Sequence, residues 1–296
     1  MTLTRAGAEA IGSCCMNDEL AMTIGIPVYN EQRHISRAVM SVRAQNLPFA
    51  HEILIVDDGS TDNTPIVLDE LRNRFTNVRV VRHPHNKGRP AARSTLLQEA
   101  RGELFAMLDA DDLWYPEKIK RQIELVGGIE SFPENLMICG NILFVDHTIR
   151  KAWVKDFAKA YTDSYNLRRI LQSDNTPISQ VALANTEFLR KVGAFDSRLS
   201  RAQDWDFLIR FFSVGGRIRF VPGQPLALFN FRAENRNPIE ILKCMDLVIK
   251  KHGHLYNEFN VDQRAVQKQI RTNYIQKFID KKKNPIKHFM VMQGLI

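Results

Sequence analysis

The sequence has few cysteines and no long apolar run. Its four cysteines, in 296 residues, form one adjacent pair and two singletons: Cys14, Cys15, Cys139 and Cys244. This spacing builds neither a zinc site nor a disulfide framework, which favours a reducing cytoplasm as the compartment. The longest apolar stretch, residues 136–145, falls short of the roughly 18 residues that a membrane-spanning helix needs. A disulfide scaffold and an integral membrane protein are therefore not expected.

The N-terminus lacks the apolar core of a signal peptide. Charged residues interrupt residues 1–21, namely Arg5, Glu9, Asp18 and Glu19, so this segment is predicted to be a flexible leader. The rest of the chain has the composition of a globular protein, because 44% of its residues are hydrophobic and can bury a full core.

Positive charge is concentrated near the C-terminus. The net charge is +8, and residues 241–296 hold eleven Lys or Arg against four Asp or Glu, a surplus of seven. Such a segment suits nucleic acid, anionic lipid or a polyanionic product, and it leaves the chemistry of the other residues open. Helical patterns at 241–250 and 265–278 predict a basic helical tail over residues 236–296.

Apolar runs of strand length alternate with longer amphipathic stretches in the first half of the chain. Strands are predicted at residues 22–28, 53–56, 78–81 and 104–108, and helices at 35–44, 65–75, 91–100 and 117–126. This βαβ alternation predicts an α/β fold with a mostly parallel sheet and flanking helices. Later in the chain the pattern predicts strands at 137–145 and 218–221 and a helix at 204–214.

Carboxylates follow two of the predicted strands. Asp109, Asp111 and Asp112 come directly after residues 104–108, and Asp57 and Asp58 follow residues 53–56. Open α/β sheets bind ligands at the carboxyl ends of their strands, so these acids are expected at one rim. Carboxylate oxygens there suit a hard divalent cation. Helix capping is the alternative, and for Asp112 it is the preferred interpretation.

Five motifs occur in order along the chain. They are Pro27-Val28-Tyr29-Asn30, Asp57-Asp58-Gly59-Ser60-Thr61-Asp62, Asn86-Lys87-Gly88 with Ala92-Arg93, Asp109-Ala110-Asp111-Asp112 and Gln203-Asp204-Trp205-Asp206. Over roughly residues 22–232 this ordered set resembles the family 2 glycosyltransferases, and it is far more specific than any one motif. The resemblance implies a GT-A fold, the Rossmann-like fold of nucleotide-diphospho-sugar transferases, over residues 22–235. Residues 22–112 would form its nucleotide-binding half and residues 113–235 its acceptor-side half.

The resemblance also implies roles at the nucleotide end. Pro27 and Tyr29 correspond to the family's stacking platform for the base, with ordinary packing as the alternative for Tyr29. Asp58 corresponds to the acid that accepts a hydrogen bond from the uracil imide N–H. Lys87 corresponds to a cation near the base or the phosphates, with a plain turn as the alternative. Arg93 is interpreted as a solvated or salt-bridged arginine on an amphipathic helix.

For the motifs at residues 109–112 and 203–206, the resemblance implies roles in metal binding and catalysis. Asp109 would contact the nucleotide ribose, and Asp111 would hold Mn²⁺ or Mg²⁺ on the diphosphate, where the ion would stabilise the charge of the leaving group. Asp204 would be the catalytic base, a contribution of about 10²- to 10⁴-fold. Gln203 stands where the family usually has Glu, which leaves that base in place. A helix N-cap is the alternative for Asp204, and Trp205 is either a wall for the acceptor sugar or a core residue.

The expected reaction is one inverting transfer from a nucleotide-sugar, a UDP-sugar in the first place, to a glycan or lipid-linked acceptor in cell-surface polysaccharide synthesis. The chain lacks the Gln-x-x-Arg-Trp motif of the family's processive synthases, which favours a non-processive enzyme. Arg232 falls where many members place a basic residue near the diphosphate. The tail, with Lys281-Lys282-Lys283 and the apolar residues 289–292, fits a peripheral contact with anionic lipid on the inner face of the cell membrane. A solvated appendage or a dimer contact is the alternative.

Two other functions compete with this interpretation. A pI of about 9.4 and a basic tail are typical of nucleic-acid-binding proteins, but the candidate ligand edge is acidic and carries no nucleic-acid-binding signature, so nucleic acid is not an expected partner. The second is a catalytically inert nucleotide-sugar binder. The presence of Asp109, Asp111 and Asp204 together argues against it.

Overall fold

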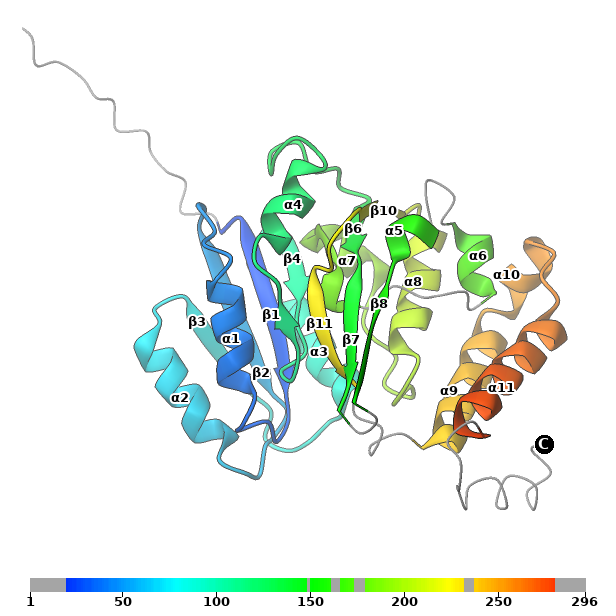
Figure 1. Cartoon of the computed structure of the whole chain (residues 1–296), viewed down its shortest axis with the longest axis horizontal. Coiled ribbons are helices and arrows are strands. Elements are labelled where there is room, and N and C mark those ends of the chain that lie inside the picture. The colour runs from blue at the N-terminus through cyan, green and yellow to red at the C-terminus, as the bar shows by residue number, and fades with distance from the viewer. Residues whose placement is uncertain (1–19, 148–149, 161–165, 173–178, 232–236, 280–296) are drawn as a thin grey trace, which may run out of the picture.

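The structure, a computed structural model, describes residues 20–147, 150–160, 166–172, 179–231 and 237–279. In its first half, strands and helices alternate as the apolar pattern predicts (Figure 1). These elements are β1 (Met22–Val28), α1 (Ile35–Arg43), β2 (His51–Asp57), α2 (Thr64–Arg74), β3 (Val78–Arg82), α3 (Arg89–Glu99) and β4 (Leu104–Met107). Some segments with sequence-based predictions lie outside the described residues: the leader up to residue 19, Arg232, and residues 281–283 and 289–292.

A seven-stranded sheet forms the centre of the molecule, in the order β10-β6-β9-β4-β1-β2-β3. Its later strands are β6 (Leu136–Gly140), β9 (Leu183–Asn185) and β10 (Arg217–Val221). β9 runs antiparallel to both of its neighbours, whereas the other pairs in this sheet are parallel. The sheet is therefore mostly parallel, as predicted. β1, β2 and β4 are buried along almost their whole length, which explains why their sequences are continuous apolar runs.

A second, four-stranded sheet lies in front of the first in Figure 1, in the order β5-β11-β7-β8. Its strands are β5 (Leu113–Trp114), β7 (Ile142–Asp146), β8 (Lys151–Lys155) and β11 (Ala227–Phe231). The single strand predicted at residues 137–145 is wrong, because the chain passes from β6 in one sheet to β7 in the other at Asn141. The Asn141 side chain is buried there. It donates to the Gly223 carbonyl at 2.8 Å and accepts from the Ala158 N–H at 3.2 Å, which fixes the crossing.

Helices cover both faces of the large sheet. α3 packs against β1 and β2, while α1 packs against α2 and β5 on the opposite side. The later elements are α4 (Lys118–Glu124), α5 (Phe157–Ala160), α6 (Leu167–Leu171), the 3₁₀ turn η1 (Ser179–Val181), α7 (Thr186–Val192) and α8 (Gln203–Ser213). α8 contacts both α6 and α7. The predicted helices at 117–126 and 204–214 are thus confirmed.

The C-terminal helices pack on the rest of the protein. They are α9 (Pro238–Lys251), α10 (Gly253–Glu258) and α11 (Gln263–Ile279), which confirms the helical patterns at 241–250 and 265–278. The Lys251 ammonium binds Asp196 at 2.9 Å and Asp206 at 2.8 Å, so α9 is anchored to α8 and to the loop before it. None of the helices that the structure describes is long and apolar enough to cross a membrane.

Candidate active site

The carboxyl ends of β1, β2 and β4 border a cavity of about 620 Å³. These strands are neighbours in the order β4-β1-β2, so the loops that follow them meet at one edge of the sheet. The cavity is lined by Pro27, Tyr29, Asp58, Asp109, Asp111 and Asp204, which the sequence selects as candidate site residues. Lys87 is different: its side chain is exposed, and its loop lines the cavity through Asn86 and Gly88 instead.

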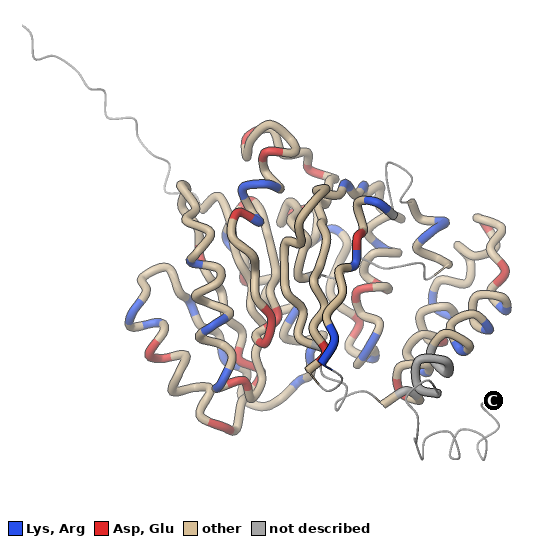
Figure 2. Tube along the Cα trace, viewed as in Figure 1, with Lys and Arg blue, Asp and Glu red and all other residues tan. Residues whose placement is uncertain are grey.

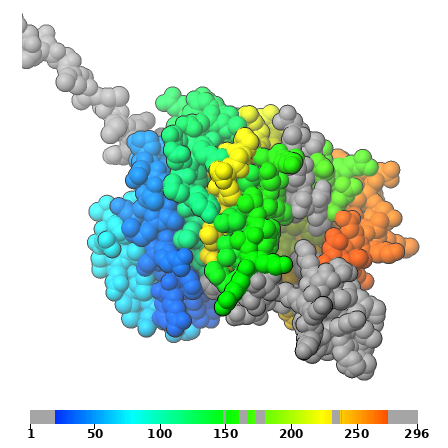
Figure 3. Space-filling view, in the orientation of Figure 1, coloured from blue at the N-terminus to red at the C-terminus, as the bar shows by residue number. Residues whose placement is uncertain are grey.

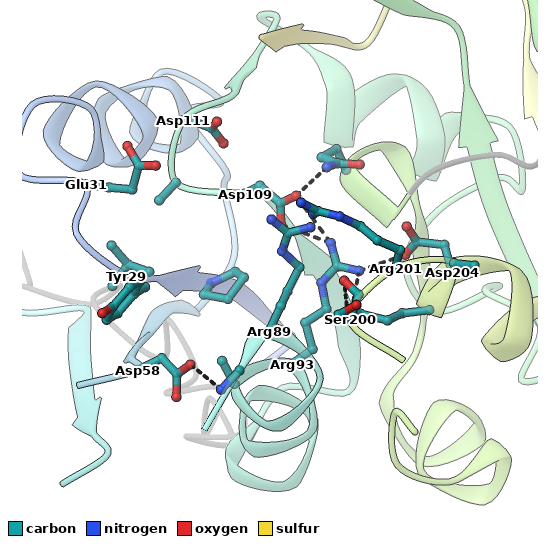
Figure 4. Close-up of a pocket in the computed structure, with 18 of the residues that line it drawn as sticks. Tyr29, Glu31, Asp58, Arg89, Arg93, Asp109, Asp111, Ser200, Arg201 and Asp204 are labelled. Carbon is teal, nitrogen blue, oxygen red and sulfur yellow. Dashed lines mark hydrogen bonds and ion pairs between the residues drawn. The ribbon is translucent and has the colours of Figure 1, made fainter. Parts of the chain in front are cut away.

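At the end of the cavity next to β1 and β2, the buried Asp58 carboxylate is held by three groups. Oδ2 accepts from the Gly88 N–H at 2.8 Å, and Oδ1 accepts from the Lys87 N–H at 3.0 Å and lies 2.7 Å from His83 Nδ1. A carboxylate offers about four acceptor positions, so this one can still accept from a ligand. Tyr29 is 43% exposed and lies on the same side of the cavity as Asp58 (Figure 4).

The loop after β2 is ordered by its own polar groups. Asp57 Oδ1 accepts from the Ser60 N–H at 3.0 Å, so this acid orders the loop. Gly59 has a φ of +71°, and a Cβ on it would lie 2.5 Å from the carbonyl carbon of His85. A residue without a side chain is therefore required where this loop touches the one after β3. Together the two loops supply Asp58 and the backbone donors that hold it.

Arg93 joins the two ends of the cavity. Its side chain is 3% exposed. Nη2 donates to both carboxylate oxygens of Asp109 at 3.2 Å, and Nη1 donates to Asp204 Oδ1 at 2.9 Å (Figure 4). Gln180 Nε2 donates to Asp109 Oδ2 at 2.6 Å. The salt-bridged interpretation of Arg93 is confirmed, and the solvated one is wrong, because α3 turns this side chain inward between two acids.

Positive side chains surround Asp109. Burial alone would raise the pKa of this carboxyl, but the charges of Arg93 and Arg89 and hydrogen bonds from Arg93 and Gln180 hold the pKa below its usual value. Arg201 also lines the cavity, and Figure 4 shows Arg89 and Arg201 beside Asp109. The acidic strand end expected from the sequence is therefore balanced by arginines, and the cavity can accept an anionic ligand.

The acids after Asp109 are tied to β11. Asn230 donates through Nδ2 to the main-chain oxygen of Asp111 at 2.5 Å and through its N–H to Asp112 Oδ1 at 2.8 Å. The capping interpretation of Asp112 is wrong, because Glu117 is the N-cap of α4, with a left-handed backbone. The Asp112 carboxylate holds the second sheet to this loop instead.

The carboxylates of the cavity offer few ligands for a divalent ion. Among the described residues, no three His, Cys, Asp or Glu side chains are grouped as a metal site. Asp109 is engaged by Arg93 and Gln180, and Asp111 lines the cavity. A single carboxylate suits Mg²⁺ or a similar ion when water and substrate phosphate oxygens complete its shell. These residues therefore fit an ion that is bound together with a diphosphate.

Two acids on the first turn of α8 have opposite environments. Asp204 is 29% exposed and lines the cavity. Asp206 is completely buried and binds Arg210, Lys251 and His252 at 2.8–3.0 Å. The charge of Asp206 is thus compensated inside the protein, which is a structural role, whereas Asp204 remains accessible to a molecule in the cavity.

The start of α8 decides between the alternative interpretations of Asp204 and of Trp205. Its N-cap is Ala202, which has a left-handed backbone, so the N-cap interpretation of Asp204 is wrong. Trp205 is 3% exposed, and its Nε1 donates to the Ile170 carbonyl at 2.6 Å. Trp205 is therefore mainly a core residue, although one part of it borders the cavity.

Several cavity residues are absent from the sequence-based site, among them Arg89, Gln180, Arg201, Ile241 and Met245. Arg89 stands two residues after Lys87. The sequence therefore indicated a basic residue in this region, but Arg89 and not Lys87 lines the cavity. The other four come from later segments with no motif of their own. Ile241 and Met245 belong to α9, within the predicted tail, which shows that this segment contributes to the cavity wall.

Three comparisons place the chain among known proteins. The profile of the family described as "Glycosyl transferase family 2" matches residues 23–193. A UDP-Glc:alpha-D-GlcNAc-diphosphoundecaprenol beta-1,3-glucosyltransferase of Escherichia coli is 34% identical over 110 residues, which are 37% of this chain and 42% of that protein. A solved structure of S. aureus TarS residues 1–349 in complex with UDP-GlcNAc has a TM-score of 0.62 at 20% identity, over 88% of this chain and 73% of that one.

A second solved structure, GalNAc-T7 with UDP, GalNAc and Mn²⁺, has a TM-score of 0.58 at 18% identity, over 78% of this chain and 48% of that one. These likenesses show that the fold is of the GT-A type. The chain spans only about a third of the length of two other curated relatives, 33% and 35%.

Proposed function

We propose that this chain, which belongs to glycosyl transferase family 2, transfers one sugar from a UDP-sugar to a hydroxyl group of a glycan or lipid-linked saccharide and inverts the anomeric configuration. The observation that carries the proposal is the single cavity with Tyr29 and Asp58 at one end and Asp204 at the other. Asp109 and Arg93 connect these ends. Such a cavity can hold a nucleotide and an acceptor hydroxyl at the same time.

The nucleotide occupies the end formed by β1 and β2. Tyr29 and Pro27 stack on the base, because an exposed aromatic ring offers a face to any base. Asp58 accepts from the uracil imide N–H and rejects bases that lack this donor. Asp109 accepts from the ribose hydroxyls. Support for a UDP-sugar comes from the relatives, of which one is named for UDP-Glc and another was solved with UDP-GlcNAc.

The diphosphate lies next to Asp111, Arg89 and Arg201. Asp111 would hold Mn²⁺ or Mg²⁺ next to the diphosphate, which would supply Lewis-acid stabilisation of the negative charge on the leaving group. Arg89 and Arg201 supply fixed positive charge in the same cavity, which favours the leaving group and costs no reorganisation. Lys87 is a candidate for an outer contact with the nucleotide.

Asp204 is the catalytic base. Its carboxylate accepts the proton of the acceptor hydroxyl as that oxygen attacks the anomeric carbon opposite the departing diphosphate. Arg93 is a positioning residue, because its buried guanidinium holds Asp204 through Nη1 and Asp109 through Nη2. The spacing between the ribose contact and the base is thereby fixed before substrate binds.

The acceptor side comprises residues 113–235, joined by α9, and the enzyme acts on the cytoplasmic face of the cell membrane. A lipid-linked acceptor is favoured because the E. coli relative is named for a diphosphoundecaprenol-linked substrate. The surplus of positive charge in residues 241–296 would attract anionic lipid, at about 1 kcal/mol for each Lys or Arg near the surface. The enzyme adds one sugar to each acceptor and does not synthesise a polymer processively.

Calorimetric titration of UDP with and without Mn²⁺ tests the donor site. Wild-type protein is expected to bind UDP more tightly with Mn²⁺, and Asp111→Asn to lose this dependence. Glu130→Gln is the matched control, because Glu130 is an exposed acid outside the cavity lining. The proposal is wrong if wild-type protein fails to bind UDP with or without the metal. If Mn²⁺ does not change the affinity for UDP, only the proposed metal dependence is wrong.

A further inference from the structure

Three aromatic rings on neighbouring strands of the second sheet form a continuous row. Phe229 on β11 is the register partner of Phe144 on β7, and Phe144 is the partner of Trp153 on β8. The ring centroids of Phe144 and Phe229 are 5.0 Å apart, and those of Phe144 and Trp153 are 5.4 Å apart with the planes 10° from parallel. Direct register partners share one face of a sheet, so the row lies along that face.

The row leads from the cavity to the surface. Phe229 lines the same cavity as Asp204. At the other end Trp153 is 43% exposed, on the strand that stands last in the order β5-β11-β7-β8. β11, β7 and β8 are seen side by side on the near face of the molecule, in yellow and green (Figure 3). We refer to Phe229, Phe144 and Trp153 as the aromatic row.

Core packing accounts for part of the row but not for its outer end. Trp114 and Trp205 are 4% and 3% exposed, and their indole N–H groups donate to the carbonyls of Gln180 and Ile170. Trp153 keeps a far larger fraction of its surface in water. An exposed indole stacked on a row that reaches the cavity is placed to contact a ligand that extends out of it.

We propose that the aromatic row is a binding subsite for the acceptor, which contacts sugar rings of an acceptor saccharide beyond the one that is glycosylated. This inference rests on the proposed glycosyltransferase function. The C–H groups of a pyranose carry partial positive charge and pack against the negative face of an aromatic ring. Trp and Phe side chains have only two rotatable bonds and lose little entropy when a ligand binds.

The surroundings of Trp153 favour a saccharide over a lipid chain. Lys151 and Lys155 lie two residues away on the same strand, so they flank Trp153 on the same face. Figure 2 shows the positive charge of this hairpin at the end of β7 and β8. Polar groups beside an aromatic surface suit a ligand that offers both C–H faces and hydroxyl groups. An acyl chain would find no continuous apolar strip on this strand.

Fluorescence quenching by acrylamide tests the subsite in the intact protein. Trp153 is the only exposed indole among the three tryptophans, so quenching reports mainly on it. Cellohexaose, maltohexaose and chitohexaose are the probes, each added with UDP present. At least one is expected to protect Trp153 from acrylamide. The inference is overturned if none of the three does.

A pair of variants links protection to the aromatic ring. Trp153→Ala is expected to weaken calorimetric binding of the protecting saccharide about tenfold, which corresponds to about 1.4 kcal/mol, whereas Trp153→Phe retains most of the affinity. Val154→Ala is the control, because Val154 is 50% exposed on the opposite face of the same strand. Equal loss in both alanine variants would mean that the strand, and not the row, was damaged, and would refute the subsite. UDP binding is measured in every variant as well. If it is retained while the subsite is refuted, the proposed glycosyltransferase function is not affected.

Discussion

The two halves of the proposed catalytic domain each contain a pair of acids, after β2 and on α8, and these two pairs are held by different means. In residues 22–112, Asp57 and Asp58 are bound largely by backbone N–H groups of nearby loops. In the later half, Asp204 and Asp206 are bound by side chains, which are Arg93, Lys251 and His252 from other segments and Arg210 from the next turn of α8. A backbone donor survives most substitutions, whereas a side-chain partner can be removed by one. Single variants should therefore have their largest effects in the later half.

Asp204→Asn is the strongest test of this difference. The amide retains the shape of the side chain but cannot take a proton, so kcat is expected to fall by about 10²- to 10⁴-fold. Initial rates of UDP release, measured with the UDP-sugar and acceptor that the wild type uses, give this value. UDP affinity should stay unchanged, because Asp204 lies at the far end of the cavity. Activity close to that of the wild type would exclude Asp204 as the base.

Asp206→Asn should affect stability instead. The substitution leaves Lys251, Arg210 and His252 around a neutral side chain, and removal of one partner from a buried ionic group costs about 3 kcal/mol in the free energy of unfolding. Urea denaturation followed by circular dichroism measures the loss. Asp246→Asn is the control, because its pair with Arg271 is exposed and should contribute less than about 1 kcal/mol. Equal losses in the two variants would contradict the structural role of Asp206.

The same acid predicts a pH dependence. Burial would raise the pKa of Asp206, but hydrogen bonds from His252 and Lys251 and the charge of Arg210 lower it from 3.8 to about 2. Because the pKa is lower in the folded state, this stabilisation is complete above the unfolded value and is lost as pH falls through about 2. Wild-type protein should lose more stability between pH 4 and 2 than Asp206→Asn, about 1.4 kcal/mol for each unit of pKa shift. Parallel acid-unfolding curves would show that the pKa of Asp206 is not lowered in the folded state.

The smallest expected effect lies where the two halves meet, at Arg93. Arg93→Lys keeps the charge but replaces the planar guanidinium, whose two terminal nitrogens bind Asp109 and Asp204, by a single ammonium nitrogen on a shorter side chain. Loss of one charge-assisted hydrogen bond costs about 1.5 kcal/mol, hence about tenfold in kcat. The KM for the donor should change less, because the nucleotide contacts are elsewhere. A comparable loss in thermal stability, with kcat unchanged, would make Arg93 a structural residue only.

The first half of the fold could be predicted well from the sequence. β1, β2 and β4 are buried on both faces, so each reads as an apolar run, and the acids that follow them meet at one edge. Local pattern is weaker where structure depends on distant partners. β9 has only three residues, and the bend at Asn141 is fixed by hydrogen bonds to residues 158 and 223. Neither leaves a periodic signal.

The candidate site was predictable to the same extent. Acids within motifs, such as Asp58, Asp109 and Asp204, were found because their types and order carry the signal, and all three line the cavity. The environment of each acid was not predictable. The sequence allowed Arg93 to be solvated, and Gln180 and Arg201 had no motif, because contacts across 71 or 111 positions of the chain arise only from the three-dimensional fold.

The strand that covers the β4 edge of the large sheet is made late in synthesis. β9 lies between β4 and β6, so the first four strands, β3-β2-β1-β4, have an open edge at β4 until residues 183–185 emerge from the ribosome. At about 5–20 residues per second, this interval lasts roughly 4–15 seconds. An open strand edge pairs readily with other chains. The nascent protein is therefore expected to need protection by a chaperone during that interval, and a message that is translated slowly over codons 108–183 should yield more aggregate.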